Sequence, residues 1–382
     1  MPRFGRLTKG LALASLGAGC TLIYDAGDFE GRSGTDSGVL PVDAAPEAAP
    51  LPVDPCEHAG PPTRPDAGDN GPQSSMVFAL SDLVLTVADA DRVGFDLDGV
   101  CTCDNRPNTD GGSSCATTKL ENVCDLDGGR DNGLAKLLAL LPSGQRDGGF
   151  PVGFDLSANE GVESLVVEVG NYNGTATDPS VSLFLFDAPG LDPPAPCDGG
   201  SVGDAGLNGA GKPRPAWLGC DAWKLGSSSL AGDVPLTFAR DAWVTGGVLV
   251  ARLDALAIRI GESLLPVYGA TITTKLANGP GLPRLENGVL AGRARATDLL
   301  KAFGEQAPTD AGPLCTAPNF TLFKAGLCAS LDMNDRSSPV APCDSISFSV
   351  KFEAKTARKG SVAPSASPSN KCATAGDFAK CP

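Results

Sequence analysis

Histidine is almost absent from this 382-residue chain, whose one histidine is His58. His58 lies in a segment rich in Pro, Ala and Asp, so we expect no histidine in the folded part. That excludes a Ser-His or Cys-His nucleophile and a histidine-based metal hydrolase site. Paired carboxylates, as in glycosidases, remain the one route to catalysis. No pair stands out among the candidates, which are Glu163, Glu168, Asp187, Asp254, Glu262 and Glu286.

Positive charge and aromatic residues are also scarce. The chain has 30 Lys and Arg against 45 Asp and Glu, a formal net charge of −15, which argues against nucleic acid or anionic headgroups as partners. Because only 5% of the residues are aromatic, the tryptophans Trp217, Trp223 and Trp243 are expected in the core. We therefore predict a non-enzymatic binding or structural protein, with a glycan-directed hydrolase using paired carboxylates as the alternative.

The N-terminal apolar run, residues 10–19, is too short to span a bilayer, which takes about 20 helical residues. It follows three basic residues, Arg3, Arg6 and Lys9. A positive region before a short apolar core is typical of a secretory signal. Residues 1–19 are therefore predicted to be a signal peptide of an exported protein and are excluded from the fold.

Small residues, Gly17, Ala18 and Gly19, stand directly before Cys20. This arrangement resembles the lipobox of bacterial lipoproteins, in which the cysteine is lipidated. The resemblance implies a lipid anchor at Cys20, and Thr21 after the cysteine favours the outer membrane or cell surface. Two or three acyl chains hold a protein on a membrane without a transmembrane helix. An ordinary cleaved signal, with Cys20 as a disulfide partner, is the alternative.

Cysteine is abundant: setting Cys20 aside leaves twelve of the 13, an even set that can pair completely in an oxidising compartment. We predict that two bonds close loops, Cys197–Cys220 and Cys372–Cys381. We also predict two local disulfides within a group of four, Cys101, Cys103, Cys115 and Cys124, for which a zinc site is the alternative. The pairings of four others stay open, namely Cys56, Cys315, Cys328 and Cys343.

Domain organisation follows from composition and periodicity. Residues 20–75, rich in Pro, Ala and Asp, predict a flexible tether. The segment SISFSVKFEA, residues 345–354, alternates apolar and polar residues, which predicts a strand with one solvent-facing side. Similar segments predict an antiparallel, jelly-roll-like β-sandwich over residues 76–355, with a few short helices, near 134, 297 and 319, and long disulfide-braced loops. Residues 356–382 are predicted to form a C-terminal tail.

The phrase DLDG occurs twice, at residues 96–99 and 125–128. Alternate aspartates in a turn aim hard oxygen ligands at one point, which suits calcium. An EF-hand is excluded because Lys136 stands where its bidentate glutamate would be.

We predict a looser calcium site, the one cofactor that the sequence indicates. Its expected ligands are aspartates of this Cys-rich segment: Asp125, Asp127 and Asp131, with Asp96 and Asp98 as further contributors. The alternative is a pair of Asx-turns that only start a helix at Leu134.

Three segments resemble a family of uncharacterised predicted envelope lipoproteins of Gram-negative bacteria. They are the YNG…DP loop from Tyr172, NGVLAGRARATDLL from residue 287 and PCDSISFSVKF from residue 342. The resemblance implies no activity. Tyr172 and Asn173 are the predicted binding residues, because a tyrosine can stack on a sugar, whereas a tyrosine that packs its own turn is the alternative. The predicted partners are the membrane, through the lipid, and an unknown envelope protein or glycan.

Lipidation can be tested at Cys20. Produced in a bacterium with the lipoprotein pathway, the protein should partition into detergent, because acyl chains transfer favourably out of water. Cys20→Ala should release the protein or block its processing. Phase partitioning and N-terminal mass analysis check this, and a soluble wild-type chain with an unacylated N-terminus contradicts it.

Overall fold

The computed structural model describes most of the chain from residue 58 onward. The described residues are 58–68, 71–84, 92–103, 114–116, 124–139, 157–193, 206–209, 211–260, 263–278, 281–306, 312–334, 339–364, 371–372 and 377–381. All of them belong to one compact unit, Pro52–Pro382. The predicted signal peptide, Cys20 and Glu262 lie outside the described residues.

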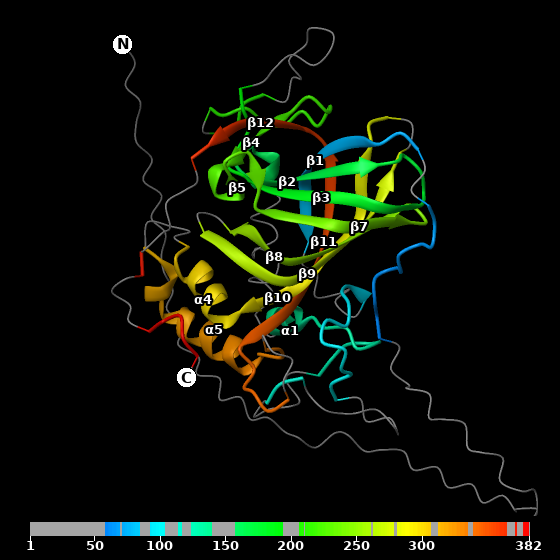
Figure 1. Cartoon of the computed structure of the whole chain (residues 1–382). Helices are drawn as coiled ribbons and strands as arrows, with labels where there is room; N and C mark the ends of the chain where they lie inside the picture. The colour runs from blue at the N-terminus through cyan, green and yellow to red at the C-terminus, as the bar shows by residue number, and fades with distance from the viewer. Residues whose placement is uncertain are drawn as a thin grey trace, which may run out of the picture. The chain divides into compact units, whose positions relative to one another are not determined.

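Eight antiparallel strands close into a barrel in the order β1-β11-β10-β9-β8-β7-β3-β2 (Figure 1). The ring closes at β1, which pairs with β11 on one side and with β2 on the other. The strands of the barrel are β1 (Ser74–Val84), β2 (Ser164–Tyr172), β3 (Asp178–Ala188), β7 (Thr237–Thr245), β8 (Val248–Ile260), β9 (Ser263–Ala277), β10 (Arg284–Arg295) and β11 (Ser345–Thr356).

The prediction of a mainly β, antiparallel fold is confirmed, but the predicted sandwich is corrected to a closed barrel. A sandwich keeps edge strands in each sheet, whereas every barrel strand has two hydrogen-bonded neighbours. Closure depends on long-range pairs such as Phe78 with Thr356. Alternation along a strand reports that the strand exists and which face is apolar, but not which strand lies beside it.

Apolar side chains fill the barrel and form one continuous core. Among its largest fully buried members are residues from five strands around the ring: Phe78 and Leu83 of β1, Leu183 of β3, Leu249 of β8, Leu285 of β10 and Ile346 of β11. At about 25 cal/mol per Å² of apolar surface, burying each such side chain contributes roughly 1.5–3 kcal/mol to the stability of the fold.

Within the described part of the chain, α-helices and a 3-10 turn pack against the barrel at the places where the sequence predicts helices. They are α1 (Gly133–Ala139), α4 (Ala296–Gly304), η4 (Leu314–Thr316) and α5 (Pro318–Ala329). Figure 1 shows α4 and α5 side by side beside the barrel, with α1 next to β11. The helices share the core of the barrel through three leucines, Leu299 and Leu300 of α4 and Leu327 of α5. Among the described residues, no helix has the length and apolar content needed to cross a membrane.

The first half of β11, residues 345–350, is buried on both faces, which corrects the prediction of one solvent-facing side there, whereas Lys351 and Glu353 farther along the strand are half-buried. Ile346 and Phe348 point into the core, as the alternation predicts. The intervening serines, Ser345, Ser347 and Ser349, are at most 1% exposed. Acidic and amide side chains cover this face and bond to it, so its polarity marks an internal polar contact instead of the surface.

A second layer covers the outer face of β1, β2 and β3. It contains β4 (Ala222–Gly226), η3 (Ser227–Ser229), the short pair β5 (Leu230–Ala231) and β6 (Val234–Pro235), and β12 (Arg358–Ala363), which is parallel to β4. Fully buried Trp223 forms a separate apolar cluster there with Phe186 and Val166. Trp243 is also buried, whereas Trp217 is half-buried beside Trp223, with their ring centroids 5.9 Å apart.

Four disulfides join described cysteines: Cys103–Cys124, Cys115–Cys343, Cys315–Cys372 and Cys328–Cys381. The predicted Cys372–Cys381 bond is wrong, because both cysteines instead bond to the region of η4 and α5. Within the group of four, only Cys103–Cys124 is a local disulfide, because Cys115 bonds to Cys343. Spacing cannot reveal these pairs, because the fold brings together cysteines up to 228 positions apart.

Two more cysteines, Cys101 and Cys220, are disulfide-bonded. Cys197, the predicted partner of Cys220, lies outside the described residues, as does Cys56. Part of the segment predicted as a tether contacts the barrel unit. The amide of Ala59 donates to the carbonyl of Gly128 at 2.8 Å, and the Trp243 indole donates to the carbonyl of Pro62 at 3.1 Å.

A buried ion pair joins two strands that are not neighbours in the barrel. Arg259 of β8 donates two hydrogen bonds to the carboxylate of Asp187 on β3, one of them at 2.7 Å. β7 lies between these strands in the barrel order, but it pairs with β8 only over Trp243–Thr245. The ion pair therefore connects β3 and β8 in the region where β7 and β8 are not hydrogen-bonded to each other. Both side chains are less than 8% exposed.

Breaking this pair from one side should destabilise the barrel strongly. Arg259→Met leaves the Asp187 carboxylate buried without its cation, which should cost about 3–5 kcal/mol of unfolding free energy. Adding Asp187→Leu should recover most of that loss, because apolar side chains of similar size tolerate burial. Urea unfolding of both variants measures this. A double variant no more stable than Arg259→Met contradicts the role assigned to the pair.

Candidate functional site

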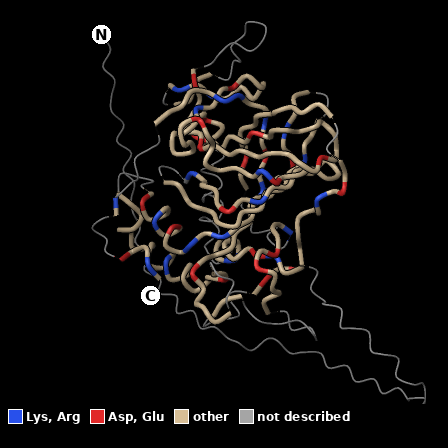
Figure 2. The backbone as a smooth tube through the Cα atoms, viewed as in Figure 1, with Lys and Arg blue, Asp and Glu red and all other residues tan. Residues whose placement is uncertain are grey.

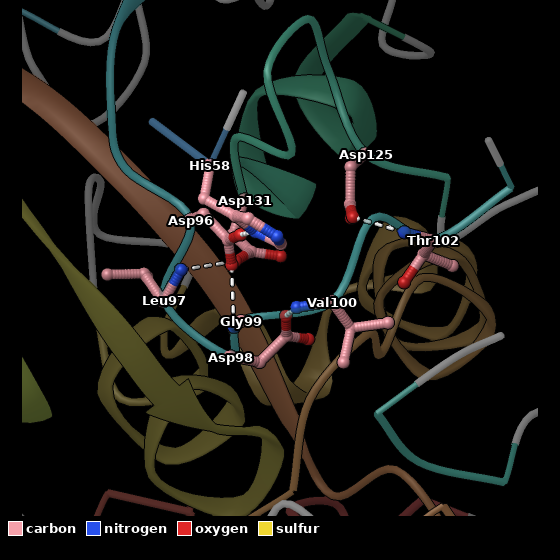
Figure 3. A network of polar contacts seen from close by, with 9 residues as sticks. All are labelled: His58, Asp96, Leu97, Asp98, Gly99, Val100, Thr102, Asp125 and Asp131. Atoms are coloured by element: carbon pink, nitrogen blue, oxygen red, sulfur yellow. Dashed lines mark hydrogen bonds and ion pairs between the residues drawn. The ribbon is translucent and has the colours of Figure 1, made fainter. Parts of the chain in front are cut away.

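Three aspartates from two loops meet beside β11 and form what we call the acidic centre: Asp96, Asp98 and Asp131. One carboxylate oxygen from each lies within 4.8 Å of the others. Figure 3 shows Asp96 and Asp131 next to each other, with Asp98 further along the same loop as Asp96. Asp131 is 1% exposed. Figure 2 shows acidic residues, in red, gathered in the loops that Figure 1 draws in cyan and teal.

The first DLDG phrase folds into the turn that its residues favour. Oδ1 of Asp96 accepts from the Gly99 amide at 2.6 Å, and Oδ1 of Asp98 accepts from the Val100 amide at 2.9 Å. These are Asx-type turns, which aspartate side chains form readily. Gly99 has φ of 75°, a left-handed conformation that glycine adopts without strain.

The two loops are tied to each other at several points. Oδ2 of Asp131 accepts from the Leu97 amide, and Oδ2 of Asp125 accepts from the Thr102 amide, each at 2.6 Å. The Cys103–Cys124 disulfide lies beside the second contact. The centre is therefore held by a covalent bond and by backbone donors, which reduces the entropy lost on ligand binding.

Burial dominates the electrostatics of this region. It raises the pKa of Asp131 well above the ordinary value, and repulsion from Asp98 and Asp125 acts in the same direction. Burial also raises the pKa of Asp98, and that of Asp125 to about 8. Carboxylates this close together in a low-dielectric site need protons or a cation to offset their repulsion.

Two further charged groups, Asp332 and Lys136, lie close enough to the centre to interact with Asp125 and Asp131. Burial raises the pKa of Asp332 to about 6, against hydrogen bonds from Ser347 that favour the ionised form. Burial lowers the pKa of Lys136, while Asp332 and Asp125 oppose that shift. Lys136, which stands where an EF-hand has its glutamate, thus faces acidic groups from two segments.

The structure brings together three of the five aspartates predicted as calcium ligands. Asp125 lies nearby, with one oxygen committed to Thr102 (Figure 3). Asp127 is exposed, and its backbone carbonyl accepts from the Arg130 guanidinium at 2.5 Å. Of the predicted core of the site, Asp125, Asp127 and Asp131, only Asp131 lies in this cluster, and calcium binding stays a prediction. The two DLDG phrases look alike, but only the first turn points both aspartates toward Asp131.

His58 and Cys101 also approach Asp96, and the three could be mistaken for a zinc site. Cys101 is disulfide-bonded, so it offers no thiolate to a metal. Nδ1 of His58 contacts Oδ2 of Asp96. Because Cys103, Cys115 and Cys124 are also disulfide-bonded, the alternative of a zinc site on that group of four is excluded.

Tyr172 and Asn173 do not form the predicted binding surface. Tyr172 is 3% exposed, and its hydroxyl donates to the carbonyl of Thr175 at 2.7 Å. The Asn173 side chain accepts from the Thr175 amide and donates to the carbonyl of Thr177. Both residues therefore stabilise their own turn, as the alternative to a binding role predicts.

A groove of about 380 Å³, here called the outer groove, lies on the outer face of β2 and β3 and was missed by the sequence analysis. Its lining combines apolar residues with three charged ones: Phe184, Phe186, Leu225, Leu230, Pro235 and Val362, with Glu168, Asp233 and Lys359. Nζ of Lys359 lies 2.6 Å from Oε2 of Glu168 and 5.7 Å from the Phe186 ring centroid. Phe184 and Phe186 are two positions apart on β3, a spacing that places both side chains on one face of the strand. The sequence does not tell whether that face forms a groove or part of the core.

The other carboxylates considered for catalysis lie in different environments. Asp187 is bound to Arg259. Burial raises the pKa of Glu163, whereas the nearby Arg259 charge lowers it. Glu286 is bound to Arg284, and Asp254 is exposed. No family model, curated protein or solved structure matches this chain, so its function is inferred from its sequence and its sites.

Asp332 should make stability depend on pH in a defined direction. Because its folded-state pKa is about 6 and its ordinary value is 3.8, the folded protein binds this proton more tightly. That stabilisation is complete below about pH 4 and is lost as the pH rises through 6. Asp332→Asn cannot ionise, so relative to wild type it should gain about 2–3 kcal/mol of unfolding free energy between pH 4 and 7.

Urea unfolding in EDTA at several pH values measures this difference. The amide can keep both contacts with Ser347, whose hydroxyl donates or accepts. Asp254→Asn, which removes an exposed carboxylate, serves as the control. If the difference between wild type and Asp332→Asn does not change with pH, the assignment is wrong.

Proposed function

We propose that this protein is a lipid-anchored protein of the outer membrane or cell surface, and that its barrel binds an envelope glycan without cleaving it. The observation that carries the binding role is the outer groove, where phenylalanine rings and charged side chains line one depression. Its volume falls within the range of about 300–1,000 Å³ that is usual for ligand sites.

The disulfides support export. All ten cysteines in the described part of the chain are disulfide-bonded. Disulfides of this kind form and persist in oxidising compartments. Anchoring at Cys20 is inferred from the lipobox-like sequence, and the acidic net charge leaves the lipid as the means of attachment.

The groove offers the two kinds of contact that sugars use. The C–H face of a sugar ring packs on an aromatic face, and Phe184, half-buried on β3, presents such a face. Its cross-strand neighbour Phe238 is 38% exposed and extends this aromatic row on β7. Sugar hydroxyls can bond to the charged groups at the rim, Glu168, Asp233 and Lys359.

A glycan-directed hydrolase is the second candidate, because the groove contains two carboxylates beside phenylalanine rings. In that role Asp233 or Glu168 would protonate the leaving oxygen, and the other would act as base or nucleophile. Glu168 already accepts from Ser75 at 2.9 Å and pairs with Lys359, so both of its carboxylate oxygens are engaged. That arrangement suits a fixed binding group better than a general acid.

Binding can be tested with immobilised and soluble oligosaccharides of bacterial envelopes. We expect wild type to bind one class, and Phe184→Ala to lose at least about tenfold in affinity, because one stacking surface disappears. Leu322→Ala, on an exposed residue of α5, is the matched control and should bind normally. Wild-type protein that binds no oligosaccharide would overturn the proposal.

Release of reducing ends separates the two candidates. The binding proposal expects none. If wild type releases reducing ends and Glu168→Gln or Asp233→Asn abolishes that release, the hydrolase replaces it.

A further inference from the structure

The acidic centre has buried oxygen atoms that the described chain leaves without a partner. Oδ1 of Asp131 and Oδ2 of Asp98 are buried, and neither accepts a well-formed hydrogen bond from the described residues, although the nearby Ser114 side chain lowers the pKa of Asp98. The other oxygen of each carboxylate is used by a backbone amide, of Leu97 and Val100. An unpartnered buried carboxylate oxygen costs free energy, so its presence needs an explanation.

The unpartnered oxygens belong to the same cluster. Asp96, Asp98 and Asp131 each offer one oxygen within 4.8 Å of the other two. Backbone amides hold one oxygen of each carboxylate, as the dashed lines in Figure 3 indicate, and Nδ1 of His58 contacts the other oxygen of Asp96. Carboxylates held in this way need protons or a cation among them to offset their repulsion.

The chemistry of the donors selects the kind of cation. Carboxylate oxygens are hard ligands, which calcium and magnesium prefer, whereas zinc prefers thiolate and imidazole. Cys101, the cysteine at the edge of the cluster, is disulfide-bonded and offers no thiolate. Magnesium demands a near-ideal octahedron with several waters, while calcium accepts six to eight oxygens in flexible geometry.

We propose that Asp96, Asp98 and Asp131 bind one calcium ion, with solvent completing its coordination. The two unpartnered oxygens would coordinate the ion. Its positive charge would neutralise the negative charge of these carboxylates, which burial makes unfavourable. Asp125 acts from outside the coordination shell as a nearby negative charge. This site is separate from the outer groove and does not depend on glycan binding or on lipidation.

Calcium bound here would also connect the loops to the barrel. The backbone carbonyl of Asp131 accepts from the Ser349 hydroxyl at 3.3 Å, and Oδ1 of Asn132 accepts from the Ser349 amide at 3.1 Å. Leu97, whose amide bonds to Asp131, lies on the other loop. A ligand that orders Asp131 therefore orders both loops against β11, and binding should stabilise the whole unit.

Thermal unfolding and calorimetric titration of the full mature chain test the proposal. After removal of metals with EDTA, calcium chloride should raise the melting temperature by roughly 5 °C at saturation, with a dissociation constant at or below about 1 mM. Magnesium should give a smaller shift.

Two variants and a control locate the site. Asp131→Asn and Asp98→Asn each keep the oxygen that accepts the backbone amide but remove one charge, so each should weaken calcium binding by about tenfold or more. Asp127→Asn removes an exposed aspartate of the same segment and should bind calcium as wild type does. Asp98→Asn keeps the test decisive if Asp131→Asn fails to fold.

Three results would overturn the assignment. One is no heat and no thermal shift with millimolar calcium. Another is stabilisation by zinc and not by calcium, which would point to His58. The third is an effect of Asp127→Asn as large as that of Asp98→Asn, which would mean non-specific screening of acidic loops.

Discussion

The buried serine face of β11 is the contact on which much of this structure depends. Ser345, Ser347 and Ser349 alternate with core residues, and each needs hydrogen-bond partners because water cannot reach them. Asp332 accepts from the Ser347 amide at 2.7 Å, and Asn132 accepts from the Ser349 amide. The same strand pairs with β1 and β10 to close the barrel. One strand thus forms part of the core on one face and fixes the acidic loops on the other.

The serine face also explains the close packing around it. The Gly133 amide donates to the Ser347 hydroxyl at 2.8 Å, which places the start of α1 directly on β11. A Cβ at Gly133 would lie 2.5 Å from Oδ2 of Asp332, so a larger residue there would push the carboxylate away. Because small residues let the two segments approach, the aspartates are excluded from water, and their pKa values rise.

Disulfides act on the same arrangement from outside. Cys115–Cys343 ends beside the first residues of β11, and Cys103–Cys124 joins the two loops of the acidic centre. Closing long loops removes chain entropy mainly from the unfolded state. These bonds hold irregular, glycine-rich loops that have little apolar surface of their own. The outer groove, in contrast, lies on the hydrogen-bonded strands β2 and β3 and on the β4–β12 pair, so the two sites rely on different kinds of support.

The sequence by itself determined the features that depend on local order. The alternation in residues 345–354 identified β11, apolar periodicity placed three short helices, and the first DLDG phrase formed the expected turn. Only the tertiary structure decided barrel closure, the distant disulfides, the loss of Asp127 from the centre and the burial of Tyr172. The reason is physical: a residue's neighbours in sequence set its backbone preference, whereas burial and partners come from segments far along the chain. The serines of β11 illustrate this, because their pattern specifies a polar face but not whether water or aspartate meets it.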